Sequence, residues 1–230
     1  MIQVRAQHQL ARSDFGQLKA RHHISVGSAN DNPLHGPVGE LIVWNDDEIA
    51  AGAGVPMHPH ANTEIITYVR EGRVVHQDSL GNGGTLNPGD VQVMSAADGI
   101  RHAELSDRAT KIFQIWIKPR KVGGEPRFHA KSFAREPGNR FAVLASGYPE
   151  DAGALPLQAN ARLLRATLNA GESLAYPLGT DRTAYLVVAT GSVTVNDVAL
   201  DARDGAALRA EAVLRFAARE QAELFMVVLG

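Results

Sequence analysis

The chain has 230 residues, and its 23 Lys and Arg against 25 Asp and Glu give a formal net charge of −2. This balance, without a basic run, argues against nucleic acid or an anionic membrane as a partner. The chain has no cysteine, so any metal must bind His, Asp or Glu. The N-terminus lacks the apolar core of a signal peptide, and no apolar run approaches the roughly 20 residues of a membrane span. We therefore expect a cytoplasmic protein.

The first part of the chain predicts short strands separated by turns. Residues 1–35 are polar and turn-rich, and they predict one short strand or turn followed by a surface loop. Residues 38–50 predict two short strands around a turn-forming Asn-Asp-Asp trio at 45–47. Residues 64–79 alternate between apolar and polar side chains, which predicts two strands joined as a hairpin at 71–72.

Two more strands and a connecting segment follow. Residues 91–96 come after a Pro-Gly-Asp turn and predict a strand. Residues 110–119 alternate in character until Pro119, which predicts a strand that ends there. Residues 120–140 are rich in charge, Gly and Pro, so we expect them to connect two halves of the chain.

The second half of the chain repeats the turns of the first half. In the register that superposes Tyr185 on Tyr68, Ala175 and Pro177 occupy the positions of a histidine pair in the first half. All nine histidines lie between His8 and His129, so the repeat loses the metal-binding residues. A second metal site is therefore not expected.

Residues 206–224 have the composition of a helix and the periodicity of strands. Their Ala, Arg and Glu content favours helix. Apolar residues nevertheless alternate with polar ones from Leu208 to Phe216, and this period of two predicts strands. Many short strands with Gly and Pro turns predict an all-β barrel or jelly roll, and two of them fit the length.

Two short residue pairs are suited to binding one metal ion. The pairs are His58 with His60, and His102 with Glu104. Residues i and i+2 of a strand point to the same side, so both members of each pair can face one point. If the two strands lie close together, three imidazoles and a carboxylate converge and leave coordination positions open. Open positions suit a catalytic metal better than a structural one.

Two other residues compete for roles at this site. Glu64 shares the parity of the first histidine pair and is the rival for the fourth ligand position, or it orients a ligating histidine from outside. The competing interpretation is a strand carboxylate that makes an ordinary hydrogen bond. His76 has a different parity relation to its neighbours, and we expect it to be a surface histidine.

The spacing of these residues matches the two cupin motifs. Gly52 precedes His58 by five intervening residues, Glu64 follows His60 after three, and a His-x-Glu follows a Pro-Gly-Asp turn. The strings HPH, EIITYVREG, HQDSLGN, NPGDVQVMSAADGIRHAE and FQIWIKP resemble the pirin family. The resemblance is closest to bacterial members with quercetin 2,3-dioxygenase activity.

The resemblance implies a bicupin, made of two stacked double-stranded β-helix barrels with little helix. We expect an N-terminal metal-binding cupin barrel over 1–125 and a C-terminal barrel without metal ligands over 126–230. The resemblance also implies one divalent metal, usually Fe(II), on ligands at the positions of His58, His60, His102 and Glu104. Nickel, copper, zinc and manganese remain alternatives, because imidazole and carboxylate ligands suit several metals.

The implied activity is the oxidative opening of the heterocyclic ring of a flavonol such as quercetin with O2, which releases CO. A bound divalent ion makes an enol or phenol more acidic, and Glu104 is the expected catalytic base for the flavonol hydroxyl. The expected partners are therefore a small aromatic substrate and O2. The alternative is a metal-bound regulatory module of pirin type, which acts on a protein partner without turnover.

Overall fold

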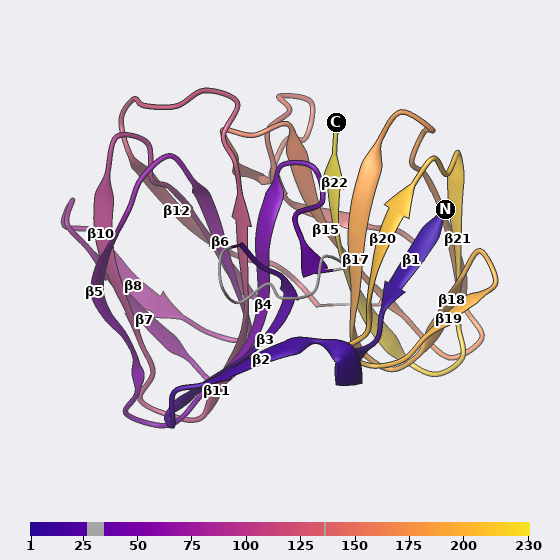
Figure 1. Cartoon of the computed structure of the whole chain (residues 1–230), viewed down its shortest axis with the longest axis horizontal. Coiled ribbons are helices and arrows are strands. Elements are labelled where there is room, and N and C mark those ends of the chain that lie inside the picture. Colours follow the sequence, from indigo (N-terminus) through magenta and orange to yellow (C-terminus); the bar gives the residue numbers. More distant parts are fainter. Residues whose placement is uncertain (27–34, 136) are drawn as a thin grey trace. The chain divides into compact units, whose positions relative to one another are not determined.

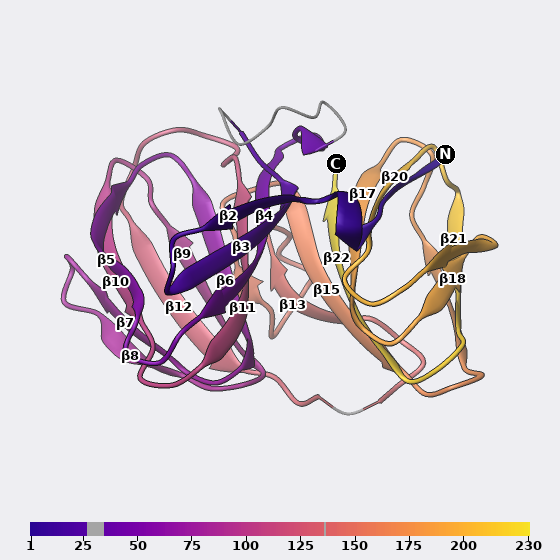
Figure 2. The ribbon, with the colours of Figure 1, turned by 60° about the horizontal axis from the view of Figure 1, so that its bottom comes forward.

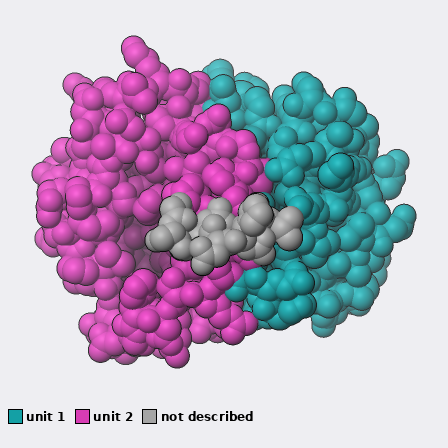
Figure 3. Space-filling view, viewed as in Figure 1, with its two compact units in different colours: residues 1–10, 135–154, 160–230 teal, residues 11–134, 155–159 magenta. Residues whose placement is uncertain are grey.

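The structure, a computed structural model, describes residues 1–26, 35–135 and 137–230. The chain folds into two compact units (Figure 3): unit 1 is residues 1–10, 135–154 and 160–230, and unit 2 is residues 11–134 and 155–159. The sequence predicts one boundary at 125 and 126, whereas these units divide the chain at more than one point. The N-terminal residues belong to unit 1 because β1 (Ile2–Arg5) pairs antiparallel with β20 (Gly205–Arg209).

Unit 2 contains two antiparallel sheets that face each other (Figures 1 and 2). The larger sheet has the order β12-β9-β6-β11-β4-β3-β2, and the smaller has the order β5-β10-β7-β8. The bounds are β2 (Ala11–Asp14), β3 (Leu18–Ile24), β4 (Leu41–Ile49), β5 (Gly54–His60), β6 (Glu64–Glu71), β7 (Val74–Asp78), β8 (Gly83–Leu86), β9 (Asp90–Ser95), β10 (Ile100–Leu105), β11 (Thr110–Ile117) and β12 (Arg127–Ser132), with β14 (Leu155–Pro156) also in this unit.

Unit 1 repeats the same plan. Its strands have the orders β1-β20-β17-β22-β15-β13 and β16-β21-β18-β19. Apart from the edge strands β1 and β12, these correspond in sequence order to β12-β9-β6-β11-β4-β3 and β5-β10-β7-β8 of unit 2. The predicted internal repeat is therefore confirmed. The further bounds are β13 (Ala142–Ser146), β15 (Ala161–Leu168), β16 (Ser173–Pro177), β17 (Thr183–Thr190), β18 (Val193–Val195), β19 (Val198–Leu200), β21 (Val213–Ala218) and β22 (Ala222–Leu229), and a 3-10 turn, η1, covers Gln7–Gln9.

The interior of unit 1 is apolar. Leu208 on β20 and Leu214 and Phe216 on β21 are buried in one cluster with side chains of the other strands. The period of two therefore correctly predicts strands over 206–224, where composition favours helix. Ala175 on β16 lies opposite Arg215 on β21. In the corresponding strands of unit 2, β5 and β10, His58 lies opposite His102.

Three predictions for the first part of the chain are wrong. The segment 38–50 holds one continuous strand, β4, because Asp46 is buried in an ion pair with Arg70 of β6 instead of forming a turn. Residues 1–24 form three strands, while residues 27–34 of the predicted loop lie outside the described part of the chain. Residues 127–132 of the expected connection form β12, which pairs with β9.

The predicted hairpin at 71–72 is also wrong, although both of its strands exist. β6 pairs with β9 and β11, whereas β7 pairs with β10 and β8, so the chain passes from one sheet to the other at this turn. Gly72 allows the passage. Its φ is +80°, and a Cβ there would lie 2.3 Å from the carbonyl oxygen of Ala109.

Among the described residues, no helix is long and apolar enough to cross a membrane.

Candidate metal centre

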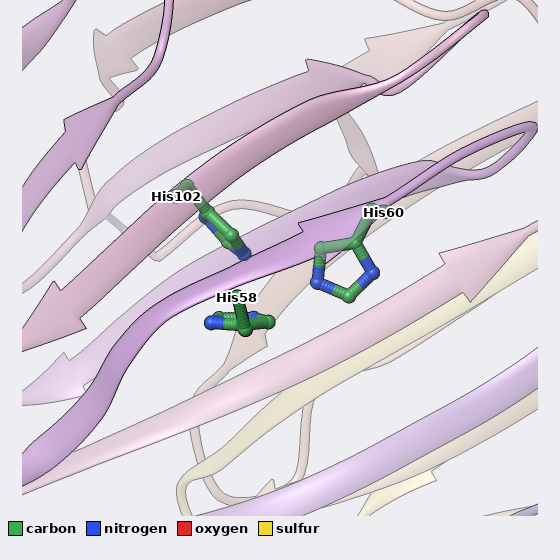
Figure 4. Close-up of side chains that lie close together, drawn as sticks. All are labelled: His58, His60 and His102. Atoms are coloured by element: carbon green, nitrogen blue, oxygen red, sulfur yellow. The ribbon is translucent and has the colours of Figure 1, made fainter.

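Three histidines meet on neighbouring strands of the small sheet of unit 2. In the antiparallel pairing of β5 with β10, His102 lies opposite His58, and Ile100 lies opposite His60. Side chains that are opposite or two residues apart share one face of a sheet, so all three rings gather together (Figure 4). Their centroids are 4.4 Å apart for His58 and His102, 4.7 Å for His58 and His60, and 5.0 Å for His60 and His102.

A β-bulge in β5, between Val55 and His58, lies opposite the second pair. The register shifts between His102 and Glu104, so that Glu104 lies opposite Val55 instead of the residue expected from a regular ladder. Gly54 makes the close approach of β5 possible here. A Cβ on Gly54 would lie 2.2 Å from the carbonyl oxygen of Glu104, and its φ of +147° is one that glycine adopts readily.

The hydrogen bond of His58 and the lowered pKa values of His60 and His102 suit metal binding. Nδ1 of His58 lies 2.8 Å from the Pro56 carbonyl, which can only accept, so Nδ1 donates and Nε2 keeps its lone pair. Burial lowers the pKa of His60 to about 4, helped by His102 and His58 and opposed by Glu104. Burial likewise lowers the pKa of His102 to about 3, helped by His58 and His76. At neutral pH these two rings are neutral, as a metal ligand must be.

The carboxylate of Glu104 is buried and held by three donors from the facing sheet. Oε1 accepts from Thr67 Oγ1 at 2.8 Å and from Gln92 Nε2 at 2.6 Å. Oε2 accepts from Gln114 Nε2 at 2.7 Å. An ionised carboxylate has about four lone-pair sites, so one remains on Oε2 for a further partner. These donors fix the direction of Glu104 and leave it able to act as a ligand.

His76 is not the surface histidine that the sequence predicts. Its side chain is fully buried, and it lies opposite Glu104 in the pairing of β7 with β10. The alternation of β7 places His76 and Asp78 inside and Val75 and Gln77 outside. The parity of His76 relative to its neighbours in sequence does not show its burial, because β7 pairs with β10 and not with the strand that precedes it in sequence.

Two overlapping groups of side chains have the spacing of a metal site. His58, His60 and His102 form the first, and His76, His102 and Glu104 form the second. Within each group the ligand atoms all lie within 4.8 Å of one another. The structure thus brings the four predicted ligands into one region of unit 2, with His102 common to both groups.

Glu64 lies elsewhere. It is three residues from Thr67 on β6, and this odd separation turns it to the opposite face of the sheet. Its Oε2 accepts from Ser95 Oγ at 2.8 Å and from the Gln158 backbone N–H at 2.9 Å. Burial raises its pKa, while these two hydrogen bonds act in the other direction. The position of Glu64 therefore matches the interpretation of a strand carboxylate with ordinary hydrogen bonds, and not that of a fourth metal ligand.

The centre is open on one side and closed on the other. His58 and His60 are half-buried, whereas His102 is 1% exposed and Glu104 is 3% exposed. Trp116 of β11 packs edge-on against His60, with ring centroids 5.0 Å apart. Trp116 also contacts an apolar cluster that includes Met94 and Ile100. A small molecule that approaches the histidines from the open side would therefore contact the indole ring of Trp116.

Sequence reasoning missed the residues that support the site. Thr67, Gln92 and Gln114 are polar residues with apolar neighbours on both sides in their strands, and Trp116 shares the parity of Gln114. Polar residues on the inner face of a buried sheet are costly unless paired, so their pattern is a signal for a polar site inside the barrel. Their partner could not be named without knowing which strands face each other.

These donors fit a divalent transition metal. Three imidazoles and one carboxylate match the ligand preferences of iron, nickel and zinc. Both ring nitrogens of His102 are buried without a hydrogen-bond partner, which a metal bond would relieve. Two cupin-like barrels, one of them carrying this cluster, define the class of the protein as a bicupin.

Comparison with known proteins shows to which family of bicupins the chain is similar. The pirin family model matches residues 3–117, and the model of the quercetinase C-terminal cupin domain matches residues 143–228. A pirin-like protein of Caulobacter vibrioides is 53% identical over 95% of both chains. The quercetin 2,3-dioxygenase of Escherichia coli K12 is 33% identical over 98% of this chain and 97% of its own.

A solved structure agrees with these relatives. The bacterial pirin YhhW of Escherichia coli, crystallised in complex with nickel(II), superposes with a TM-score of 0.93 at 33% identity. The match covers 100% of this chain and 99% of the other. The chain belongs to the pirin family, and its bicupin fold is the one that the sequence predicts.

Proposed function

We propose that the protein is a metal-dependent dioxygenase that opens the heterocyclic ring of a flavonol such as quercetin and releases CO. The proposed ligands are His58, His60, His102 and Glu104, the proposed metal is Fe(II), and the proposed location is the cytoplasm. The flavonol and O2 together contain the atoms of the ring-opened ester and CO, so the reaction needs no external electron donor.

The observation that carries the proposal is the convergence of three imidazoles at the open side of the barrel. His58 and His60 are reachable from solvent, whereas the deeper ligands are shielded. A site with open positions beside an aromatic wall suits a planar aromatic substrate better than a purely structural ion. The Escherichia coli relative that bears the name of this activity supports the same conclusion.

The residues have distinct roles in this proposal. When bound, the metal supplies Lewis acidity and a site for redox chemistry with O2. The one free lone pair of Glu104 Oε2 would bind the metal before substrate arrives and, once released from it, take the proton of the flavonol 3-hydroxyl, while Thr67 and Gln92 hold Oε1 in place. Trp116 packs beside the substrate ring, and the buried face of the centre excludes water.

The direct test is turnover by iron-loaded protein. Quercetin is added under anaerobic conditions, air is then admitted, and flavonol absorbance and CO are followed. We expect the absorbance to decay and CO to form, with at least a 100-fold lower rate in His58→Ala, the usual scale for loss of a group essential to a catalytic step. Equal rates in the two proteins would contradict the proposal for quercetin. Metal retention without turnover of any flavonol would favour the regulatory module.

A further inference from the structure

A polar cavity of about 140 Å³ lies in unit 2 and shares no residue with the metal centre. It is lined by Glu64 at the start of β6, Ser95 at the end of β9, Arg127 at the start of β12, Gln158, and residues of the segment 119–125. A water molecule takes about 30 Å³ of the liquid, so the cavity has room for one small organic molecule. The proposed activity uses none of these residues.

Three side chains of the cavity stand in one row across the large sheet. Glu64 lies opposite Ser95 in the pairing of β6 with β9, and Arg127 lies opposite the same Ser95 in the pairing of β12 with β9. Neighbouring strands are about 4.8 Å apart, so the backbones that carry the carboxylate and the guanidinium are about 10 Å apart. The small side chain of Ser95 leaves a hollow between two opposite charges.

The carboxylate of Glu64 forms the floor of this cavity, since the residue is 1% exposed. Its Oε2 accepts from Ser95 Oγ at 2.8 Å and from the Gln158 backbone N–H at 2.9 Å. Among the described residues, Oε1 accepts no hydrogen bond. A buried anion that lacks donors is costly, so a cationic donor inside the cavity would stabilise Oε1.

Two cations stand at the rim of the cavity. Lys121 and Arg127 are exposed, and neither forms an ion pair with an acidic side chain in the described part of the chain. Burial raises the pKa of Glu64, and the positive charges of Arg120 and Arg127 act in the other direction. Glu125 also lines the cavity, but it is exposed and hydrated. The rim therefore suits an anionic group, and the floor suits a cationic one.

We propose that this cavity binds a small zwitterion, an α-amino acid with a short side chain. Its ammonium group donates to Glu64 Oε1, and its carboxylate lies between Lys121 and Arg127. A simple amine would leave the two rim cations without an anion, and a simple carboxylate would be repelled by Glu64. The site is separate from the metal centre, so the proposal is independent of the dioxygenase activity.

The test compares three probes of similar size: L-alanine, ethylamine and propionate. Full-length protein loaded with diamagnetic Zn(II) is titrated with each probe and followed by isothermal titration calorimetry. We expect one equivalent of L-alanine to bind, and the other two probes to bind at least about 10-fold more weakly, because each lacks one charged group. The NMR shifts of the Gln158 and Gly124 amides locate the site, since L-alanine also coordinates metal ions.

Variants separate the floor from the rim. Glu64→Gln keeps an acceptor oxygen for Ser95 and Gln158 but carries no charge, and we expect it to bind L-alanine about 10–100-fold more weakly, the equivalent of one hydrogen bond to a charged group. Arg127→Gln should also weaken L-alanine binding. Lys131→Gln, at an exposed position of β12 outside the cavity, should leave it unchanged.

Three results would overturn the zwitterion site. The first is no shift of the Gln158 and Gly124 amides at about 10 mM L-alanine, where even a Kd of 1 mM gives near saturation. Glu64 would then only hold the segment 155–159 in place. The others are ethylamine binding as tightly as L-alanine, and unchanged affinity in both variants. If Glu64→Gln does not fold, Arg127→Gln on the exposed rim decides. No readout depends on flavonol turnover.

Discussion

His102 on β10 lies directly opposite His58 on β5, and their ring centroids are 4.4 Å apart. The two residues are far apart in sequence, so the register of one strand pair brings them together. A slip of one residue would turn one ring to the outer face of the sheet. The centre therefore depends on the bulge at Glu104 and the close approach at Gly54 as much as on the ligands.

His102 should matter more for metal binding than His58, because it belongs to both groups of ligands. We expect His102→Ala to abolish binding of Ni(II) by isothermal titration calorimetry. His58→Ala should weaken it by about 10–100-fold, since the deeper ligands remain. Equal losses of Ni(II) affinity in the two variants would contradict the inference that His102 belongs to both groups of ligands.

The two glutamates should behave differently. Glu64→Gln is expected to retain metal, because Glu64 faces Ser95 and Gln158 on the other side of the large sheet. Glu104→Gln is expected to lose most of the bound metal. Metal content per chain after dialysis is the measurement, and the reverse order would restore Glu64 as the ligand.

Gln92 should stabilise the centre through Glu104. Its amide is fully buried and donates to Glu104 Oε1 and to Thr67 Oγ1. Gln92→Leu leaves a buried carboxylate short of a donor, and we expect a loss of about 1–3 kcal/mol in the free energy of unfolding without metal. Urea denaturation measures this loss, and Gln77→Leu, at an exposed position of β7, is the control.

The metal-free protein should lose stability as the pH falls from about 6.5 to about 4. Burial lowers the pKa of His60 to about 4 and of His102 to about 3, below the ordinary value of 6.5. The unfolded chain therefore binds protons on these rings before the folded chain does, and stability rises with pH across this window. In His60→Gln/His102→Gln the dependence should be shallower, as followed by urea denaturation against pH. An unchanged slope of stability against pH would show that other groups control this pH dependence.

Asp47 should have the opposite pH dependence. Burial raises its pKa to about 8, helped by Asp46 and Glu104, from an ordinary 3.8. Between these values the unfolded chain is ionised there and the folded chain is not, so stability falls as the pH rises. Asp47→Asn removes that cost, and we expect a gain of at least about 1 kcal/mol at pH 8 but none at pH 4. A gain of equal size at both pH values would point to packing instead.

Local patterns in the sequence were enough to predict the class of fold and to propose a set of ligands. Period-two alternation correctly predicted β11 and the strands of 206–224, because side chains of a half-buried sheet must alternate. The spacing of His58 with His60 and of His102 with Glu104 placed each pair on one side of a strand. These are properties of neighbouring residues, which a sequence displays directly.

The tertiary structure alone decided which strands are partners. β7 lies beside β10 and not beside β6, and this places His76 against Glu104 instead of at the surface. The same long-range pairing turns Glu64 away from the histidines and points Gln92 and Gln114 at Glu104. Such contacts join residues whose separation along the chain carries no periodic signal, because they arise from the closure of two sheets into a barrel.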